Sequence, residues 1–307
     1  MNKYNSLSVA ISAFNEERKI RKCLESVKWA DEIIFVDNSS NDNTLEIAKE
    51  YTKKIFTQKN DPFNIDLQKN LGIEKATCDW ILVLDADEVV TSELKQEIKS
   101  QISTFNSQFS GFMIPRKNII FNKWIEHSGW YPDYQLRLFR NGRGKYENKH
   151  VHEPLSVRGK LGKFNEPFIH YNYETVYQFL YKHLCVYAPN EAEDLLRKGY
   201  VFDWKGAIRL PMSEFLSRYF AREGYKDGFH GLILALLMGV YHLSIFAYLW
   251  EKKKFIDIKD ENITHGLEEE LKKSRKEFNY WYSSKSLETE KNLFKKTTIK
   301  IKRKLNL

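Results

Sequence analysis

Polar side chains able to bind a cation or a nucleotide follow three separate apolar runs. They are Asn15 and Glu16 after residues 7–12, Asp37 after residues 31–36, and Asp85 and Asp87 after residues 80–84. Two carboxylates two positions apart, just beyond a buried strand, can coordinate Mg²⁺ or Mn²⁺ together with phosphate oxygens. Such a cation neutralises charge that develops on a diphosphate leaving group. Taken alone, the acidic pair is equally compatible with a solvated turn.

A polar stretch, VDNSSNDNT, places Asp37 at the end of a predicted strand and at the entrance to a predicted helix. An aspartate there can accept hydrogen bonds from a nucleobase or a ribose, and the N-terminus of the following helix is a natural site for an anion. The same residues would also serve as a turn with a helix cap. The stretch therefore favours a nucleotide site only when it is combined with other motifs.

Strands and helices alternate through the first hundred residues. Apolar runs predict strands at 7–12, 31–37, 55–58 and 80–84, and helical spacing predicts helices at 16–27, 44–51, 65–76 and 92–98. This alternation predicts an α/β fold with a mostly parallel sheet and flanking helices. Ligands of such sheets bind beyond the carboxyl ends of the strands. The polar residues at the three strand ends should therefore gather along one edge.

The pattern changes after residue 111, where short strand-like runs separated by turns extend to about residue 173. From residue 175 onward the chain reads as helical, and residues 231–250 form an apolar run just long enough to span a bilayer. A membrane-spanning helix, a helix lying in the membrane interface and a buried core helix all remain open for this run. We predict a catalytic domain at 1–173, a helical region at 174–282 and a basic tail at 283–307.

The formal net charge is +8, and residues 291–307 hold seven basic side chains and no acidic one. A basic tail suits an anionic surface, although a solvated tail is the plainer alternative. No nucleic-acid-binding signature accompanies it, so we expect a membrane surface rather than a nucleic acid. Three widely spaced cysteines indicate a reducing compartment, and the first residues lack the apolar stretch of a signal peptide. These features predict a cytoplasmic protein that associates peripherally with the inner face of the cytoplasmic membrane.

Four runs in order, SVAISAFNEE, VDNSSNDNT, QKNLG and DWILVLDADE, resemble the successive motifs of glycosyltransferase family 2. The resemblance implies a GT-A fold, a nucleotide-sugar donor and inversion at the anomeric carbon. A later run, GWYPDYQLRLFRNGRGKYENKHVHEPL, resembles the branch that includes bacterial lipopolysaccharide-core glucosyltransferases. The sequence lacks the motifs of three other enzyme classes. It has no G-x-G-x-x-G of dinucleotide-dependent dehydrogenases, no GxxxxGK[ST] of P-loop enzymes and no G-x-S-x-G nucleophile elbow.

Transferred residue by residue, the resemblance implies a donor site and a metal site. Asn15 and Glu16 would lie in the first nucleotide-binding loop, Asp37 would contact uracil or ribose, Lys69 would contact the donor, Asp85 would bind ribose or metal, and Asp87 would bind Mn²⁺ or Mg²⁺. The chain departs from the common Asp-Asp-Gly-Ser pattern after the second strand, where Asn38 and Ser39 replace the second Asp and the Gly. That departure bears on the identity of the base more than on the role of Asp37.

An inverting transfer needs a general base for the acceptor hydroxyl. The family places an acidic residue after the sheet-extending segment, which makes Glu153 the first candidate and Asp133 the second; a salt bridge or a loop carboxylate is the alternative for each. Other residues have open roles: His150, His152 and His170 as metal ligands or structural histidines, Arg137 and Arg140 as phosphate contacts, and Trp124, Trp130 and Tyr131 as a sugar platform or core residues.

These motifs together predict an inverting hexosyltransferase that uses a nucleotide-sugar donor, with UDP-sugars first. Its acceptor would be a cell-surface saccharide or glycolipid such as the lipopolysaccharide or lipooligosaccharide core. One alternative keeps the fold but uses a polyprenyl phosphate as acceptor. Another, of a different class, is a non-catalytic nucleotide-sugar-binding or membrane adaptor. No motif identifies the sugar, because a few pocket contacts decide donor choice.

Overall fold

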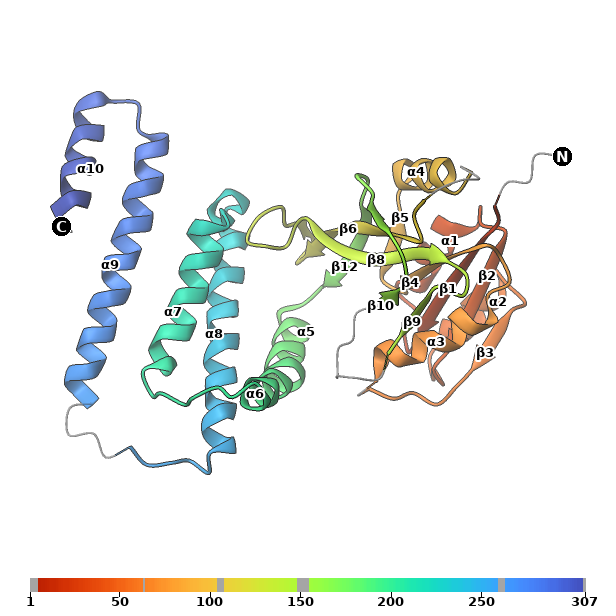
Figure 1. The fold of residues 1–307 in the computed structure, drawn as a ribbon, viewed down its shortest axis with the longest axis horizontal. Helices are drawn as coiled ribbons and strands as arrows, with labels where there is room; N and C mark the ends of the chain where they lie inside the picture. The colour runs from red at the N-terminus through yellow and green to blue at the C-terminus, as the bar shows by residue number, and fades with distance from the viewer. Residues whose placement is uncertain (1–4, 63, 104–107, 148–154, 259–262, 306–307) are drawn as a thin grey trace. The chain divides into compact units, whose positions relative to one another are not determined.

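The computed structural model describes residues 5–62, 64–103, 108–147, 155–258 and 263–305. The chain divides into two compact units, which are described separately below (Figure 1). The first unit comprises Met1–Ile119 and Tyr131–Asn172, and the second comprises Ile120–Trp130 and Tyr173–Leu307. The segment Ile120–Trp130 thus belongs to the helical unit, although both of its sequence neighbours belong to the sheet.

A mixed β-sheet forms the centre of the first unit. Its strands follow the order β3-β2-β1-β4-β8-β6-β12-β5, with β11 beside β6. Their bounds are β1 (Leu7–Ala13), β2 (Glu32–Asp37), β3 (Ile55–Thr57), β4 (Trp80–Asp85), β5 (Glu88–Val90), β6 (Gly111–Ile120), β8 (Asp133–Arg140), β11 (Leu161–Lys163) and β12 (Phe168–Tyr173). Two further strands, β9 (Gly144–Tyr146) and β10 (Leu155–Val157), form a small antiparallel pair of their own.

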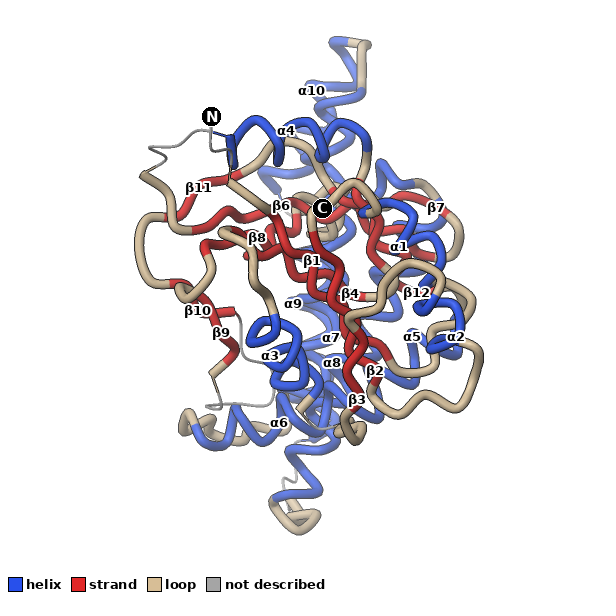
Figure 2. Tube along the Cα trace, turned by 90° about the vertical axis from the view of Figure 1, so that its right-hand side faces the viewer, coloured by secondary structure: helices blue, strands red, loops and turns tan. Residues whose placement is uncertain are grey.

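The register of the strands brings the predicted polar residues to one edge of the sheet. Strand β1 pairs in parallel with β2 and β4, so that Ala13 lies beside Asp37 and Ser12 lies beside Asp85. In Figure 2 these strands run side by side. Strand β8 is antiparallel to β4, and it therefore begins at the edge where β4 ends. Asp133, the first residue of β8, consequently lies at the same edge as Asp85.

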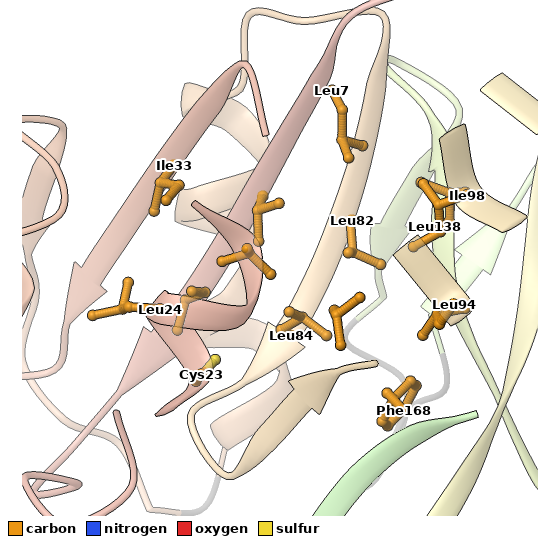
Figure 3. Packing of buried hydrophobic residues seen from close by; sticks show 14 of the residues in the cluster. Leu7, Cys23, Leu24, Ile33, Leu82, Leu84, Leu94, Ile98, Leu138 and Phe168 are labelled. Carbon is orange, nitrogen blue, oxygen red and sulfur yellow. The ribbon is translucent and has the colours of Figure 1, made fainter. Parts of the chain in front are cut away.

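The alternation of side chains along β1 and β4 gives the sheet two apolar faces. One face is covered by α1 (Ile20–Val27) and α4 (Ser92–Ser103), whose apolar sides pack on β1, β2 and β4. Figure 3 shows this layer, including Leu24 and Cys23 of α1 and Leu94 and Ile98 of α4 beside Leu82. Helix α2 (Thr44–Lys49) follows the turn after β2 and packs beside α1.

Helix α3 (Ile65–Lys75) covers the opposite face of the sheet together with β9 and β10. The helix lies close to β1 because Gly72 has no side chain: a Cβ there would lie 3.2 Å from that of Ala10. Asn70 joins α3 to β9, since its side chain donates to the carbonyl of Tyr146 and accepts from the amide of the same residue. This packing holds Lys69 and Tyr146 over the carboxyl end of β4.

The described part of the second unit is mostly helical, and it also contains the short strand β7 (Lys123–Trp124). It contains α5 (Val176–Leu180), a π-helical turn (Tyr181–Tyr187), α6 (Ala188–Arg197), α7 (Gly206–Leu216), a second π-helical turn (Ser217–Ala221), a 3-10 turn (Gly224–Asp227), α8 (Phe229–Lys252), α9 (Ile263–Thr289) and α10 (Leu293–Leu305). Helix α8 packs against α6 and α7, and α9 packs against α7. A buried Asp227 fixes the Ile120–Trp130 segment to this unit by accepting hydrogen bonds from the amides of Glu126 and His127.

The apolar run predicted at 231–250 lies within α8. Length and composition alone would allow this helix to cross a membrane, and 44% of its most apolar window is buried inside the unit. Leu234, Met238 and Leu249 are among its buried residues, and they belong to the apolar cluster of the second unit. The opposite side of the helix is exposed, and its side chains are apolar as well.

The predicted fold class is confirmed: a sheet with flanking helices precedes a helical C-terminal region. Among the described residues, parallel pairing joins the strands in the order β3-β2-β1-β4 and also joins β11 to β6. Strands β8 and β6 extend the sheet in antiparallel fashion, as does the pairing of β12 with β5. The sheet is therefore more mixed than the alternation of the first hundred residues predicts.

Candidate active site

Two loops meet beyond the carboxyl ends of β1 and β2. Asn15 has a positive φ of 55°, and its side-chain oxygen accepts a hydrogen bond from the amide of Asn41 at 2.9 Å. The amide of Glu16 donates to the hydroxyl of Thr44 at 2.7 Å. Asp37 is 2% exposed, and its carboxylate faces the amide of Ser40. The structure therefore brings the loops that carry Asn15, Glu16 and Asp37 together, and their role in binding a nucleotide stays a prediction.

Asp85 lies between two buried cations. Its Oδ1 is 2.6 Å from the ammonium of Lys69, and its Oδ2 contacts the guanidinium of Arg137. Burial works to raise the pKa of Asp85, but Arg137 and then Lys69 hold that pKa well below its usual range. Burial also works to lower the pKa of Lys69, and the charge of Asp85 more than reverses that effect. Both oxygens of Asp85 are thus occupied by protein cations.

Arg137 serves a second carboxylate besides Asp85. Its Nη2 also donates to Oε1 of Glu88 at 2.8 Å, and both side chains are buried. The other Glu88 oxygen accepts a hydrogen bond from the amide of Asp85 at 2.9 Å. Two protein carboxylates thus hold the Arg137 guanidinium, and they compete with its predicted role as a phosphate contact.

Asp87 has a different environment from Asp85, although only one residue separates them. Its Oδ1 lies 3.6 Å from Nε2 of His170, and its Oδ2 lies 3.8 Å from the ammonium of Lys19. Burial works to raise the pKa of Asp87, and the neighbouring His170 outweighs it, so the pKa lies below the ordinary value. Neither contact is as short as those of Asp85, which leaves the Asp87 carboxylate able to accept a further ligand.

A chain of polar side chains links Asp87 to Asp133. Nδ1 of His170 lies 2.7 Å from the side-chain oxygen of Asn118, which is fully buried. Because an amide oxygen only accepts hydrogen bonds, Nδ1 carries the proton and Nε2 presents its lone pair toward Asp87 when the imidazole is neutral. The amide nitrogen of Asn118 makes a long contact of 3.5 Å with Asp133. Asn118 thus orients His170 and touches Asp133.

Asp133 is held by its neighbours on the antiparallel strands. Its Oδ2 accepts a hydrogen bond from Nε of Arg116 at 2.7 Å, and its Oδ1 accepts one from Gln135 at 2.9 Å. The other predicted base, Glu153, lies outside the described residues, as do His150 and His152. Of the three histidines that sequence offers as metal ligands, His170 is therefore the one whose surroundings are described.

A pocket of about 590 Å³ opens beside Asp85 within the first unit. Its lining combines cations, carboxylates and aromatic rings, and it includes Asp66, Lys69, Asp85, Arg116, Tyr134, Arg137 and Tyr146. A space of this volume is in the range of small-molecule sites. Mixed charges and rings of this kind are suited to a sugar bearing phosphate groups.

The sequence left the roles of several other residues open. Trp124 and Trp130 belong to the second unit, where the Trp130 ring packs against Phe179, so Trp130 contributes to that unit's apolar cluster. The guanidinium of Arg140 lies over the ring of Trp80 at 4.6 Å, at the end of β8 remote from Asp133. Tyr131 directly precedes the strand-forming segment of the first unit.

Asn118 and Arg116 were not identified from the sequence. They stand two positions apart on β6, in the run PRKN, and alternate residues of a strand share one face. Reading that alternation beside Asp133 could have identified both residues. Glu88 was visible as the last residue of the acidic run, but its partners Asp85 and Arg137 could not be read from local spacing.

Metal-binding side chains at this edge amount to a pair rather than a cluster. Within the described part of the chain, no group of three or more His, Cys, Asp or Glu residues could hold a metal ion. Asp87 and His170 together offer one carboxylate oxygen and one imidazole nitrogen, 3.6 Å apart. Metal–ligand distances of about 2.0–2.2 Å allow both atoms to bind one ion, and diphosphate oxygens and water would complete its coordination. The donor set is therefore compatible with a divalent cation.

Comparisons with known proteins agree with the sequence motifs. Residues 8–158 match the family model for glycosyl transferase family 2. The lipopolysaccharide core biosynthesis glycosyltransferase LpsC of Rhizobium meliloti is 24% identical over 251 residues, which cover 80% of this chain and 92% of that protein. An uncharacterized glycosyltransferase of Rickettsia typhi is 26% identical over 84% of this chain and 89% of its own length.

Among solved structures, S. aureus TarS 1–349 in complex with UDP-GlcNAc is 15% identical, with a TM-score of 0.42, and covers 80% of this chain and 84% of that chain. The assignment rests on the family model and on the two sequence relatives, which extend beyond the matched domain to most of the chain. Residues 8–158 are therefore a family 2 glycosyltransferase domain.

Proposed function

We propose that this glycosyltransferase transfers a hexose from a UDP-sugar, with inversion of the anomeric centre, to a saccharide of a cell-surface glycan. The observation that carries the proposal is the gathering of Asp37, Asp87 and Asp133 at one edge of the sheet. At the same edge, Asp85 lines a pocket of about 590 Å³. Asp37 and Asp133 belong to β2 and β8, Asp87 lies in the turn between β4 and β5, and the three carboxylates have different partners. They can therefore take the separate tasks of binding a nucleoside, a cation and a proton.

The donor would lie along the edge formed by β1, β2 and β4. Asp37, with Asn15 and Glu16 in the neighbouring loop, would contact the base and the ribose, and the hydrogen bonds that join the two loops support this role. Asp85 is held rigidly by Lys69 and Arg137, which suits a ribose contact better than metal coordination. The cationic side chains around the pocket favour a diphosphate.

The cation would be held by Asp87 and His170. Mn²⁺ or Mg²⁺ bound there would neutralise the charge that develops on the departing nucleoside diphosphate. Asn118 contributes indirectly, because its hydrogen bond to Nδ1 fixes the imidazole tautomer in which Nε2 can bind a metal.

Asp133 is the general base that the described residues support. It would take the proton from the acceptor hydroxyl as that oxygen forms its bond to the anomeric carbon and the bond to the diphosphate oxygen breaks. Its hydrogen bonds from Arg116 and Gln135 orient the carboxylate for this task. Glu153 remains the alternative base, on the sequence resemblance alone.

For the acceptor, similarity to LpsC favours a lipopolysaccharide or lipooligosaccharide core. A polyprenyl phosphate is the second candidate, because α8 exposes an apolar surface on which a lipid could lie. Product extraction distinguishes them: a polyprenyl-linked sugar passes into organic solvent and is released by mild acid, whereas a glycosylated core oligosaccharide is not.

Helix α8 also supports a peripheral position on the inner face of the cytoplasmic membrane. Its exposed apolar side chains recur at intervals of three, four or seven residues: Phe229, Leu236, Val240, Leu243 and Trp250. We call this set the α8 stripe. Lys252, Lys253 and Lys254 follow at its end, and a basic tail lies farther along the chain. An apolar face bordered by lysines suits the interface of an anionic membrane.

The proposed reaction can be tested by measuring UDP release from a panel of UDP-sugars, with and without Mn²⁺, using core oligosaccharide as acceptor. We expect turnover with one donor, and a fall in kcat/KM of about 100-fold or more for Asp87→Asn, since metal stabilisation of a transition state is worth several kcal/mol. Asp31→Asn is the matched control, because Asp31 lies at the opposite edge of the sheet, where it accepts a hydrogen bond from the amide of Leu7. Metal-independent turnover, or full activity of Asp87→Asn, would refute the proposal.

Asp133→Asn and Glu153→Gln, assayed with the preferred donor, identify the base. Loss of a general base lowers kcat by about 10²- to 10⁴-fold. We expect that loss in Asp133→Asn and near-normal kcat in Glu153→Gln. The reverse pattern would assign the role to Glu153.

A further inference from the structure

Glu88 is the most completely buried acidic side chain at this edge, and the proposed reaction gives it no task. It is 0% exposed, at the first position of the short strand β5. Burying a carboxylate is costly unless it is paired and hydrogen-bonded. Both of its oxygens are in fact used, one by Arg137 and one by the amide of Asp85. What it stabilises is therefore the turn that contains Asp85 and Asp87.

The two contacts of Glu88 act on the same turn from different sides. The bond from the Asp85 amide closes the residues 85–88 into a loop, since donor and acceptor are three residues apart. The bond from Arg137 joins β5 to β8, and the same Nη2 reaches Oδ2 of Asp85. A planar guanidinium holds both carboxylates at fixed angles, which a lysine ammonium would not do. Asp85 is in this way drawn toward Arg137 and Lys69.

The strand that Glu88 begins also lies beside the strand that carries His170. Strand β5 pairs with β12 in the register that places Glu88 opposite His170, and the amide of Tyr171 donates to the carbonyl of Asp87 at 2.9 Å. The backbone of the turn is thereby fixed to the strand that carries the imidazole. A shift of β5 would change the 3.6 Å separation between Asp87 and His170.

From this geometry we propose that Glu88 is a positioning residue for the cation site. Acting through Arg137 and through the Asp85 amide, it assigns Asp85 to the two buried cations and leaves Asp87 to bind the divalent ion with His170. It touches neither substrate nor metal. The inference rests on the proposed cation site, and it adds that the third carboxylate of the acidic run, rather than the first two alone, sets the affinity of that site.

Glu88→Gln tests the proposal. Glutamine keeps the size of the side chain, but its amide replaces one carboxylate oxygen with an NH₂ group that cannot accept a hydrogen bond, so one of the two bonds is lost. Mn²⁺ affinity is measured by electron paramagnetic resonance titration, together with kcat and the donor KM. We expect Mn²⁺ to bind about 10- to 100-fold more weakly, as for other residues that orient metal ligands. The fall should appear in kcat more than in the donor KM.

Glu32→Gln is the matched control. Glu32 is also a buried glutamate, paired with Lys54, but it lies at the opposite end of the strands. Glu32→Gln should lower the free energy of unfolding while leaving Mn²⁺ affinity and kcat unchanged. It therefore shows what loss of a buried glutamate does when the effect is only structural. Arg137→Lys is the second variant, in case Glu88→Gln does not fold. It keeps the charge but loses the planar guanidinium, and it should weaken Mn²⁺ binding in the same direction.

Hydrogen exchange of residues 84–90 provides a readout that needs neither metal nor substrate. Exchange should be faster in Glu88→Gln than in Glu32→Gln at equal global stability. If the wild-type protein does not bind Mn²⁺, the proposed cation site is refuted. The hydrogen exchange rates and kcat of Glu88→Gln then still test whether Glu88 positions the turn. The inference would be overturned if the folded Glu88→Gln and Arg137→Lys proteins both kept the Mn²⁺ affinity, kcat and hydrogen exchange rates of the wild type.

Discussion

Asp85 and Asp87 show how two carboxylates separated by a single residue acquire different chemistry. Asp85 is the last residue of β4, whereas Asp87 lies in the turn between β4 and β5, so the two side chains have different surroundings. Asp85 meets Lys69 and Arg137, whereas Asp87 meets His170 and, more distantly, Lys19. A carboxylate whose two oxygens are both bonded to cations has little capacity left for a metal. The difference therefore comes from the partners, not from the acidic residues themselves.

This difference predicts opposite phenotypes for two conservative substitutions. Asp87→Asn should weaken Mn²⁺ binding about tenfold or more while leaving the free energy of unfolding nearly unchanged. Asp85→Asn removes one of two carboxylate partners from each of two buried cations, Lys69 and Arg137, so it should destabilise the protein by about 1.5–3 kcal/mol. Urea denaturation and Mn²⁺ titration of both variants check the prediction. Equal loss of Mn²⁺ affinity in the two proteins would show that Asp85 is also a metal ligand.

The sequence identifies the residues of this site better than it identifies their partners. The strand ends place Asp37, Asp85 and Asp87 correctly, because a buried apolar run followed by an acidic residue is a local pattern. The pairing of Asp85 with Arg137 spans 52 residues and depends on an antiparallel strand. No local spacing reports such a contact. The partnership of Asn118 with His170 also spans 52 residues, and it escapes prediction for the same reason.

A second residue-scale prediction concerns the pH dependence of stability. Burial works to raise the pKa of Glu32, but hydrogen bonds from Lys54, Ser8 and Thr77 lower it to about 2 from 4.5. A carboxylate with a lowered folded-state pKa stabilises the fold above its unfolded-state pKa, and that stability disappears as the pH falls through the folded-state value.

Glu32→Gln should therefore cost about 3 kcal/mol of unfolding free energy at pH 7, at 1.36 kcal/mol per pKa unit. The difference from wild type should shrink between about pH 4.5 and pH 2. Urea denaturation of both proteins at pH 7, 4 and 3 measures it. A difference that stays constant across this range would mean that Glu32 is not ionised in the folded protein.

At the scale of elements, β8 is the strand that completes the site. It enters antiparallel between β4 and β6, so its first residue, Asp133, arrives at the edge where β4 delivers Asp85. The alternation of the first hundred residues predicts the parallel strands, because each is followed by a helix. It cannot predict which of the later short runs lies beside β4. The antiparallel half of the sheet was therefore predicted only as an extension, without an order.

Helix α8 is the element with the clearest untested role. Its buried side packs on α6 and α7, and its other side carries the α8 stripe. Leu236→Glu with Leu243→Glu should lower partition onto anionic vesicles by about tenfold or more, since burying one leucine is worth about 1.5–3 kcal/mol. Thermal unfolding should change little, because both side chains are nearly half exposed. Flotation with vesicles measures the partition.

Val201→Glu is the control for this experiment. Val201 is 83% exposed in the same unit but lies outside the α8 stripe. It adds a negative charge to an exposed apolar position without touching the helix. Equal loss of vesicle binding in the control would assign the effect to charge alone, and unchanged binding of the double variant would remove α8 from the membrane contact.

At the scale of the whole molecule, charge is distributed along the chain in a way that the fold does not explain. The net charge of +8 includes seven basic residues after position 290, none of which is needed for the sheet or its site. Composition alone predicted this surplus, because charge can be counted without knowing the fold. Composition does not distinguish two functions of these basic residues, since a solvated tail and a tail that contacts a membrane have the same composition.

Salt dependence distinguishes these two purposes. Each lysine or arginine near an anionic membrane surface is worth about 1 kcal/mol, and this attraction is screened within a Debye length. Binding of the full chain to vesicles rich in anionic lipid should therefore fall steeply as NaCl rises from about 0.05 M to about 0.5 M, where the Debye length shortens to about 4 Å. A chain lacking residues 283–307 should bind more weakly and with a shallower salt dependence. Because the α8 stripe is uncharged, it should retain a salt-insensitive remainder of binding in the shortened chain. Equal salt dependence of the two chains would assign the tail to solvent and leave α8 as the contact with the membrane.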